Sequence, residues 1–267
     1  APTGSENKTE LDNKIKTHAT LETIVKACWS TARRLIASNK ENQEIFYGVK
    51  DLMISEMKSN PKLGITFIII ETFRDNFKTI ETADMDLFTT FAELMLKHKD
   101  DDASLLKYLG FFEAMIETRK LGIVRPSQRK IIDALCDPAL LRCPEIFTVR
   151  DPGGASASRQ QYHKRLLQLF EKCCRSKNTG AQAVLQKYIP AIELMEACVT
   201  SRLNAHSDDY AYRTILCKLA NSVHFDTPLV DFAIRPQKTT WNFLNVLIND
   251  IDHAARAETT GDSDPEH

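Results

Sequence analysis

The chain has 267 residues, enough to bury a sizeable core in one large domain or two small ones. Hydrophobic residues make up 43% and charged residues 27%, with only 9 Gly and 10 Pro, a composition that excludes disordered and fibrous classes. The formal net charge of -1 argues against nucleic acid as the main partner, because neutralising phosphates requires a clustered excess of Lys and Arg.

The cysteines and the hydropathy of the chain indicate its compartment and argue against a zinc site and a membrane span. Seven cysteines are an odd number, and most lie in apolar helical patterns, which favours a reducing compartment. No Cys-x-x-Cys pair supports zinc, and the apolar run "ITFIII" is far shorter than the ~20 residues that cross a bilayer. We therefore expect a soluble segment with no metal, no cofactor and no direct membrane contact. Its start at Ala1 and its end in "TTGDSDPEH" suggest a domain cut from a longer chain. The cysteines are Cys28, Cys136, Cys143, Cys173, Cys174, Cys198 and Cys217.

The first third of the chain shows helical periodicity after a lead-in at residues 1–20. From Leu21 to Ile36 apolar residues recur every three or four positions, which predicts a helix. The next helix should end before Pro61, because a residue that precedes proline is biased away from helical angles. Helices are thus predicted at 21–36, 42–58 and 63–73.

Two further helices carry start and stop signals. Thr82 is the expected N-cap of a helix that runs to about residue 97, and its expected buried stripe comprises Leu87, Phe88, Phe91, Leu94 and Met95. The segment "DDDASLLKYLGFFEAMIETRKLG" predicts a helix that Arg119 and Lys120 close, with Gly122 as a left-handed cap and Leu109 in the core. Pro126 then begins another helix.

Beyond residue 141 the helical pattern stops and later resumes. The Gly-Gly and Ser-rich stretch 149–157 is predicted as an exposed loop. Residues 258–267 are expected to be a disordered tail. The helical segments between them are "RQQYHKRLLQLFEKCC", "TGAQAVLQKYI", "AIELMEACVTSRL", "DDYAYRTILCKLANSV" and "TTWNFLNVLINDIDHAA".

A glutamine recurs in the first turn of three helices. Gln43, Gln128 and Gln182 each follow a long apolar helix and a short polar connection. We expect each amide to accept from free N–H groups of its own helix start and to donate to carbonyls of the preceding helix. The spacing from Gln43 to Gln128 is about twice a HEAT or armadillo unit, which predicts an all-α, armadillo/HEAT-like helical-repeat solenoid. The alternative is an irregular helical bundle.

Two His-Asp clusters resemble catalytic or metal sites. "KHKDDD" brings His98 near Asp100–Asp102, and "AHSDDY" brings His206 near Asp208 and Asp209. Both lie at helix starts, where Asp serves capping and dipole roles, so we favour the structural interpretation. With no phosphate loop or nucleophile motif either, we predict no enzyme activity and no catalytic residues.

The order of several motifs resembles a known family. Asn42-Gln43, then Asp75-Asn76, then "LFTTFAELMLKHKDDDASLLKYLGFFEAMI" and "VRPSQRKIIDAL" are similar to the RIH domain of inositol trisphosphate and ryanodine receptors. "LLQLFEKCCRSKN", "YIP", "AYRTILCKLANSVHFDT" and "TTWNFLNVLINDI" resemble the segment after the second RIH domain of an inositol trisphosphate receptor. The resemblance spans about residues 21–255 and favours the inositol trisphosphate receptor.

The resemblance implies an RIH-type domain at 21–148 and a continuing helical-repeat segment at 158–257. The parent would be a homotetrameric calcium-release channel, with this segment on the cytosolic face of the endoplasmic reticulum membrane. The segment would contact other domains and subunits of the channel and relay the ligand-binding state toward the pore. The alternative function is a free-standing armadillo-like adaptor that binds a peptide or protein in a concave groove.

Overall fold

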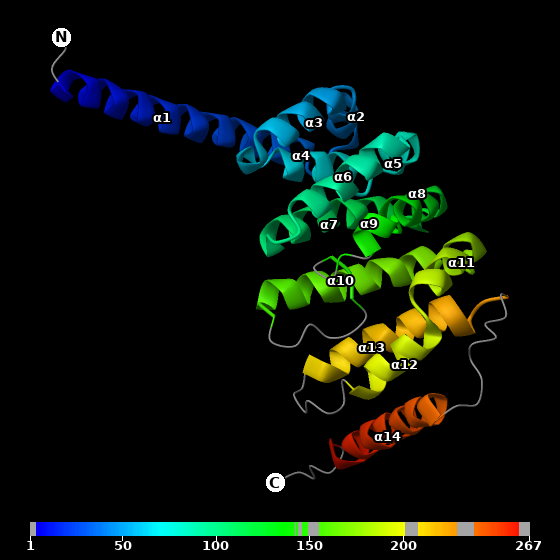
Figure 1. Ribbon diagram of the computed structural model, residues 1–267. Helices are drawn as coiled ribbons and strands as arrows, with labels where there is room; N and C mark the ends of the chain where they lie inside the picture. The colour runs from blue at the N-terminus through cyan, green and yellow to red at the C-terminus, as the bar shows by residue number, and fades with distance from the viewer. Residues whose placement is uncertain are drawn as a thin grey trace, which may run out of the picture. The chain divides into compact units, whose positions relative to one another are not determined.

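A computed structural model describes residues 4–141, 143, 146–148, 155–200, 208–228 and 238–261. The fold is all-α (Figure 1). The only strands in these ranges, β1 (Glu117–Thr118) and β2 (Gly122–Ile123), form a small antiparallel hairpin. The α-helices are α1 (Gly4–Ile36), α2 (Lys40–Tyr47), α3 (Lys50–Ser59), α4 (Ile65–Phe73), α5 (Phe77–Thr82), α6 (Met85–Lys97), α7 (Asp102–Ile116), α8 (Arg125–Leu135), α9 (Pro138–Leu141), α10 (Ala157–Cys174), α11 (Thr179–Tyr188), α12 (Ala191–Thr200), α13 (Asp208–Ala220) and α14 (Lys238–Gly261).

The chain packs into two compact units. Unit 1 contains residues 1–84 and 110–127, and unit 2 contains residues 85–109 and 128–267. These boundaries follow the contacts within each unit, whereas the expected boundaries at 21–148 and 158–257 follow from the family resemblance.

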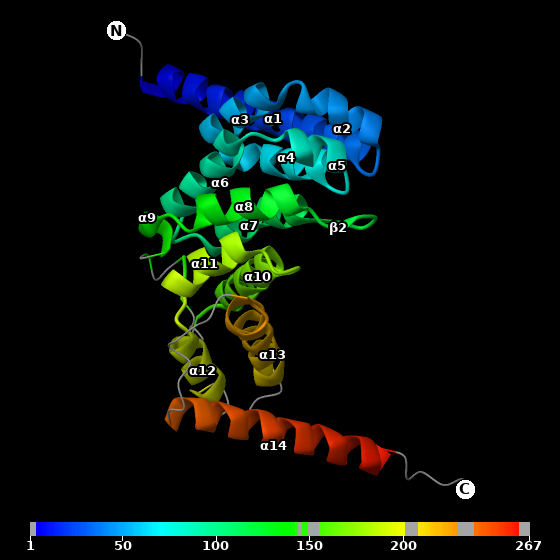
Figure 2. The same cartoon turned by 90° about the vertical axis from the view of Figure 1, so that its right-hand side faces the viewer.

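Helix α4 forms the centre of unit 1. It packs against α1, α2, α3 and α5 (Figure 2). Ile68, Ile69 and Phe73 are buried almost completely, and so is nearly every other side chain of this helix. Each such apolar side chain contributes about 1.5–3 kcal/mol to stability on burial. The run "ITFIII" is thus a core helix.

The predicted helix at 42–58 is two helices. Helix α2 ends at Tyr47 and α3 begins at Lys50, with Gly48 and Val49 between them. The prediction that Thr82 caps the next helix is also wrong, because Thr82 is the last residue of α5 and its hydroxyl donates back to the carbonyl of Lys78. A six-residue helix carries too little periodicity to be recognised in sequence.

The end of α7 also differs from the prediction. The helix stops at Ile116, before Arg119 and Lys120, and the chain turns through the β1–β2 hairpin. Gly122 does have the expected left-handed backbone, with φ of +67°, but in strand β2 instead of at a helix cap. Asp75, which follows α4, accepts from the Arg119 backbone N–H at 2.8 Å and pairs with its guanidinium at 3.2 Å. The two basic residues therefore belong to the hairpin.

The structure of unit 2 agrees more closely with the predictions made for that part of the chain. Every residue of the predicted α6 stripe is buried, as is Leu109, and α8 begins one residue before Pro126. Helix α10 packs against α11 and α13, α13 packs against α12, and α12 packs against α14 (Figure 1). These contacts bury the apolar faces that the sequence periodicity identified.

The predicted ends and loop coincide only partly with the described residues. The lead-in at 1–20 is helical from Gly4 onward, as part of α1. The loop at 149–157 lies mostly outside the described ranges, and α10 begins at its last residue, Ala157. Of the predicted tail at 258–267, residues 258–261 are helical and the others lie outside the described part.

Candidate functional site

The three predicted glutamines make the same contact in three places. Each is buried, and each side-chain amide donates two hydrogen bonds to two carbonyls at the end of another helix. Gln43 of α2 reaches the Glu71 and Arg74 carbonyls at 2.8 and 3.1 Å. Because the last carbonyls of a helix have no intrahelical donor, the amide serves as a cap supplied by another helix. We call this contact a glutamine cap.

The second and third caps both lie in unit 2. Gln128 of α8 donates to the Lys172 and Arg175 carbonyls of α10 at 2.9 and 3.2 Å. Gln182 of α11 donates to the Ser222 and Asp226 carbonyls, at the π-helical turn η3 (Asn221–Phe225) that continues α13, at 2.8 and 3.0 Å. In each copy the capped helix is the second α-helix after the glutamine's own, with short α9 counted as one of them.

The side-chain oxygen of Gln128 connects its cap to α11, the helix that carries Gln182. Gln128 Oε1 accepts from Asn178, whose own side-chain oxygen caps the start of α11. Gln182 Oε1 accepts from the Thr227 hydroxyl at 3.0 Å. Gln43 Oε1 is buried and has no hydrogen-bond partner among the described residues. The first cap is therefore the least complete of the three.

The predicted partners of the glutamines were wrong, although the residues were correct. The capped carbonyls lie 28 to 47 positions after the glutamine, not in the preceding helix. In the first copy Asn42 makes the predicted contact instead, donating to the Leu35 carbonyl of α1 at 2.7 Å. The Asn42-Gln43 pair thus joins α2 to both α1 and α4, a role that sequence spacing does not reveal.

An apolar groove lies on the surface of unit 1. The face of α1 that carries Leu21, Val25 and Trp29 lines it on one side, and the 3₁₀ turn η1 (Pro61–Leu63) and Phe67 of α4 line it on the other. Two adjoining hollows of about 440 and 270 Å³, which share the residues at 62 and 63, make up the groove. The predicted α1 stripe is therefore correct as a pattern but remains largely exposed, with Leu21 56% exposed.

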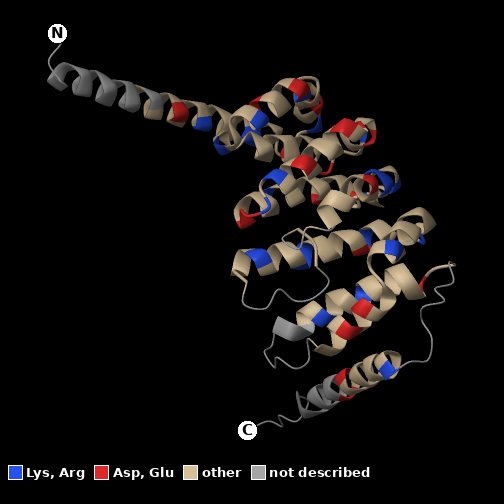
Figure 3. Ribbon diagram, in the orientation of Figure 1, with Lys and Arg blue, Asp and Glu red and all other residues tan. Residues whose placement is uncertain are grey.

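The edges of this groove are basic. Lys26, Arg33 and Lys62 line it, and Arg33 lies over the Phe67 ring at 5.2 Å. Among the described residues that line it, Glu22 is the one that is acidic, and it pairs with Lys26 at 2.7 Å. Elsewhere in the described helices, acidic and basic residues are interspersed (Figure 3).

Helix α14 presents a second exposed apolar face. Phe243 and Val246 are buried, whereas another face of the helix carries Trp241, 59% exposed, and Ile251, 67% exposed. The residues of this outer face are Trp241, Leu244, Ile248 and Ile251. Apolar side chains on two faces of a surface helix are typical of one that packs against neighbours on both sides.

The first His-Asp cluster is used structurally. Asp101 accepts from the backbone N–H groups of Ala103 and Ser104, which caps the start of α7. Asp102 pairs with Arg159 at 2.6 Å. The side chains of His206 and Asp208 lie outside the described residues. Across the described side chains, no group of three His, Cys, Asp or Glu is placed to hold a metal ion.

No protein-family model and no curated protein matches the sequence. The resemblance to the RIH domain thus rests on the motifs quoted above. In the ranges that the structure describes, no helix combines the length and the apolar character needed to cross a membrane.

Proposed function

We propose that the chain is an RIH-type helical-repeat domain of an inositol trisphosphate receptor-like calcium-release channel. In this proposal it belongs to a homotetramer in the endoplasmic reticulum membrane, faces the cytosol, and relays the ligand-binding state toward the pore. The observation that carries the proposal is the outer apolar face of α14, whose proposed occupant is another helical segment of the same channel. A relay element must contact the parts whose positions it couples.

The glutamine caps support the relay role. A helix end without contacts from other helices frays readily, whereas these ends are held by buried amides from other helices. Within unit 2 the cap at Gln128 connects through Asn178 to the start of α11, which carries Gln182. Helices linked in this way move together instead of separately, as rigid-body switching requires.

The test uses the full-length channel with Trp241→Asp, which places a charge on the outer face of α14. The matched control is Asn249→Asp, which adds the same charge at another exposed position of α14. We expect Trp241→Asp to reduce ligand-triggered calcium flux at least about tenfold, because a desolvated charge opposes docking, while ligand affinity and tetramer assembly persist. The control should conduct like the wild type.

The measurement compares ligand affinity and calcium flux on the same tetrameric preparation. Normal flux from the Trp241→Asp channel would remove the relay role of this face. Lost ligand affinity in an intact tetramer would instead assign ligand binding to this segment.

One observation favours the alternative function, a peptide-binding adaptor. The groove beside α1 is apolar with a basic edge, which suits an amphipathic helix with acidic residues along its margins. Isothermal titration with such a helix distinguishes the two functions. Micromolar affinity that Val25→Asp abolishes would support an adaptor, and the channel proposal predicts instead that neighbouring channel segments bind there.

A further inference from the structure

Two cysteines face each other across the contact between α12 and α13. The sulfur atoms of Cys198 on α12 and Cys217 on α13 lie 3.9 Å apart. Cys198 is fully buried, whereas Cys217 is partly exposed. No disulfide joins cysteines in the described part of the chain.

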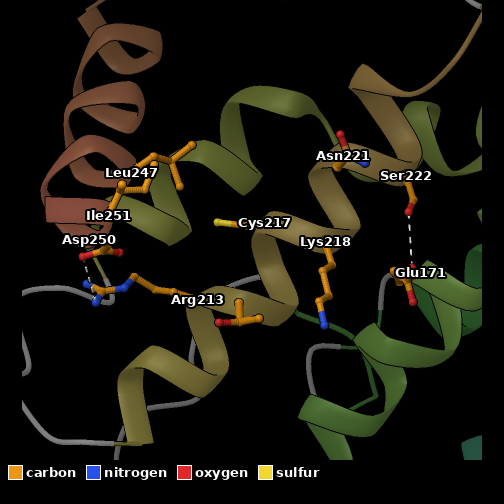
Figure 4. Close-up of a pocket in the computed structure, with 10 residues that line it drawn as sticks. Glu171, Arg213, Cys217, Lys218, Asn221, Ser222, Leu247, Asp250 and Ile251 are labelled. Atoms are coloured by element: carbon orange, nitrogen blue, oxygen red, sulfur yellow. Dashed lines mark hydrogen bonds and ion pairs between the residues drawn. The ribbon is translucent and has the colours of Figure 1, made fainter. Parts of the chain in front are cut away.

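Cys217 is reached from solvent through a cleft in unit 2. The cleft has a volume of about 580 Å³ and is lined by α10, α13, η3 and α14. Figure 4 shows Cys217 on α13 with Arg213 and Lys218 on the same helix, and Asp250 of α14 at the side of Arg213. The cleft is large enough to admit a small oxidant to one of the two sulfurs.

We propose that Cys198 and Cys217 form an oxidation site, at which hydrogen peroxide converts the two thiols into a disulfide between α12 and α13. A disulfide requires a sulfur–sulfur distance of about 2.05 Å. Rotation of the two side chains about their Cα–Cβ bonds moves the sulfurs by distances of the order of the remaining gap. The site rests on this geometry alone and is independent of the proposed channel function.

The surroundings assign different roles to the two sulfurs. The hydrogen bond that the two sulfurs share lowers the pKa of Cys217, and the positive charge of Arg213 lowers it further, against burial and the charge of Asp250. The same bond and burial raise the pKa of Cys198. Because the thiolate is the nucleophile, Cys217 is the sulfur that reacts first and Cys198 the one that resolves the product.

The two steps balance in atoms and electrons. The Cys217 thiolate attacks one peroxide oxygen, the O–O bond breaks, and the departing hydroxide takes up the proton that Cys217 released, which gives a sulfenic acid and water. The Cys198 sulfur then attacks the Cys217 sulfur, the S–O bond breaks, and hydroxide leaves with the Cys198 proton as a second water. Two thiols lose two electrons and two protons, and the peroxide is reduced to two waters.

Three other buried cysteines provide an internal comparison. Burial raises the pKa of Cys136 and of Cys174 to about 12 and raises that of Cys173 well above its usual value. None of these three lines the cleft. They should therefore react with peroxide much more slowly than Cys217.

The test treats the reduced 267-residue chain with increasing hydrogen peroxide, then alkylates the remaining thiols and identifies tryptic peptides without reduction. Cleavage after Arg and Lys places Cys198 in peptide 188–202 and Cys217 in peptide 214–218. We expect these two peptides to appear as a cross-linked pair, at peroxide concentrations about tenfold below those that modify Cys136, Cys173 or Cys174.

Variants separate the two steps. Cys198→Ser should leave Cys217 as a sulfenic acid that dimedone traps, and Cys217→Ser should leave Cys198 unoxidised. Cys28→Ser, which alters an exposed cysteine of α1, should leave the cross-link unchanged. The proposal is overturned if wild-type Cys217 reacts no faster than Cys136, or if it is oxidised without linking to Cys198. The wild-type measurement decides the matter even where a variant folds poorly.

Discussion

A buried glutamine can cap the end of a neighbouring helix because its amide group offers two donors and one acceptor. The paired carbonyls of Lys172 and Arg175 need donors, and Gln128 supplies both from one nitrogen. Glutamate at the same position is acceptor-only when ionised and would face these carbonyls with a negative charge. Each of the three glutamine caps therefore requires a glutamine at its position.

Replacing Gln128 by Ala should lower the free energy of unfolding by about 1–3 kcal/mol, because two carbonyls and the Asn178 amide lose their buried partner. Urea unfolding followed by circular dichroism measures the change. Gln168→Ala, at an exposed position of α10, is the matched control and should change stability by less than about 0.5 kcal/mol. Equal stability of the two variants would show that the cap contributes nothing.

At the scale of elements, a histidine joins two helices of unit 2. The His163 ring on α10 forms a hydrogen bond with the Tyr212 hydroxyl on α13 at 2.9 Å. The ring is buried, and burial lowers its pKa from 6.5 to about 4. In the folded chain His163 is therefore neutral at pH 5, where an unfolded chain would have protonated it.

Between pH 6.5 and about 4 the unfolded state binds more protons at this residue than the folded state does. The contribution of His163 to stability is thus complete above pH 6.5 and is lost as the pH falls toward 4. We expect the wild type to lose about 1–2 kcal/mol from this residue between pH 7 and pH 5. Urea midpoints at the two pH values measure the loss.

The control for this pH dependence is His163→Gln, which retains a hydrogen-bonding side chain but does not titrate. Its midpoint should change less between pH 7 and pH 5 than that of the wild type. The same change in both proteins would assign the pH dependence to other groups.

At the scale of the whole molecule, both units expose apolar surface on a helix near one end of the described chain. In unit 1 it is the α1 side of the groove, and in unit 2 it is the outer face of α14. Burying such surface in the assembled protein would add stability that the separate chain lacks. Each helix also has buried residues that hold it in its own unit, such as Ile36 of α1 and Phe243 of α14.

The two faces of α14 should respond differently to the same substitution. Trp241→Asp should change the free energy of unfolding of the isolated chain by no more than about 0.5 kcal/mol, because the ring is largely exposed. Phe243→Asp should cost about 3–5 kcal/mol, because the charge would be buried without a partner. Thermal melts of both variants test this. A similar loss for Trp241→Asp would mean that the outer face is already covered.

The sequence by itself determined the fold class and most of the core, because helical periodicity and chain turns are local properties. The α6 stripe, the burial of Leu109, the start of α8 near Pro126 and the positive φ of Gly122 were all predicted correctly. It also identified the residues Gln43, Gln128 and Gln182. Where local signals were short or ambiguous, at Gly48 and at Thr82, the predicted boundaries were wrong.

Only the tertiary structure decided which groups meet. The carbonyls that the glutamines cap lie 28 to 47 residues away, and periodicity within one helix holds no information about the end of another. The same applies to the two sulfurs at 3.9 Å, which belong to the separate helices α12 and α13. It applies also to the α1 stripe, whose pattern predicts an apolar face but not whether another element covers it. Contacts between distant segments depend on how helices pack, and that packing is a property of the whole chain.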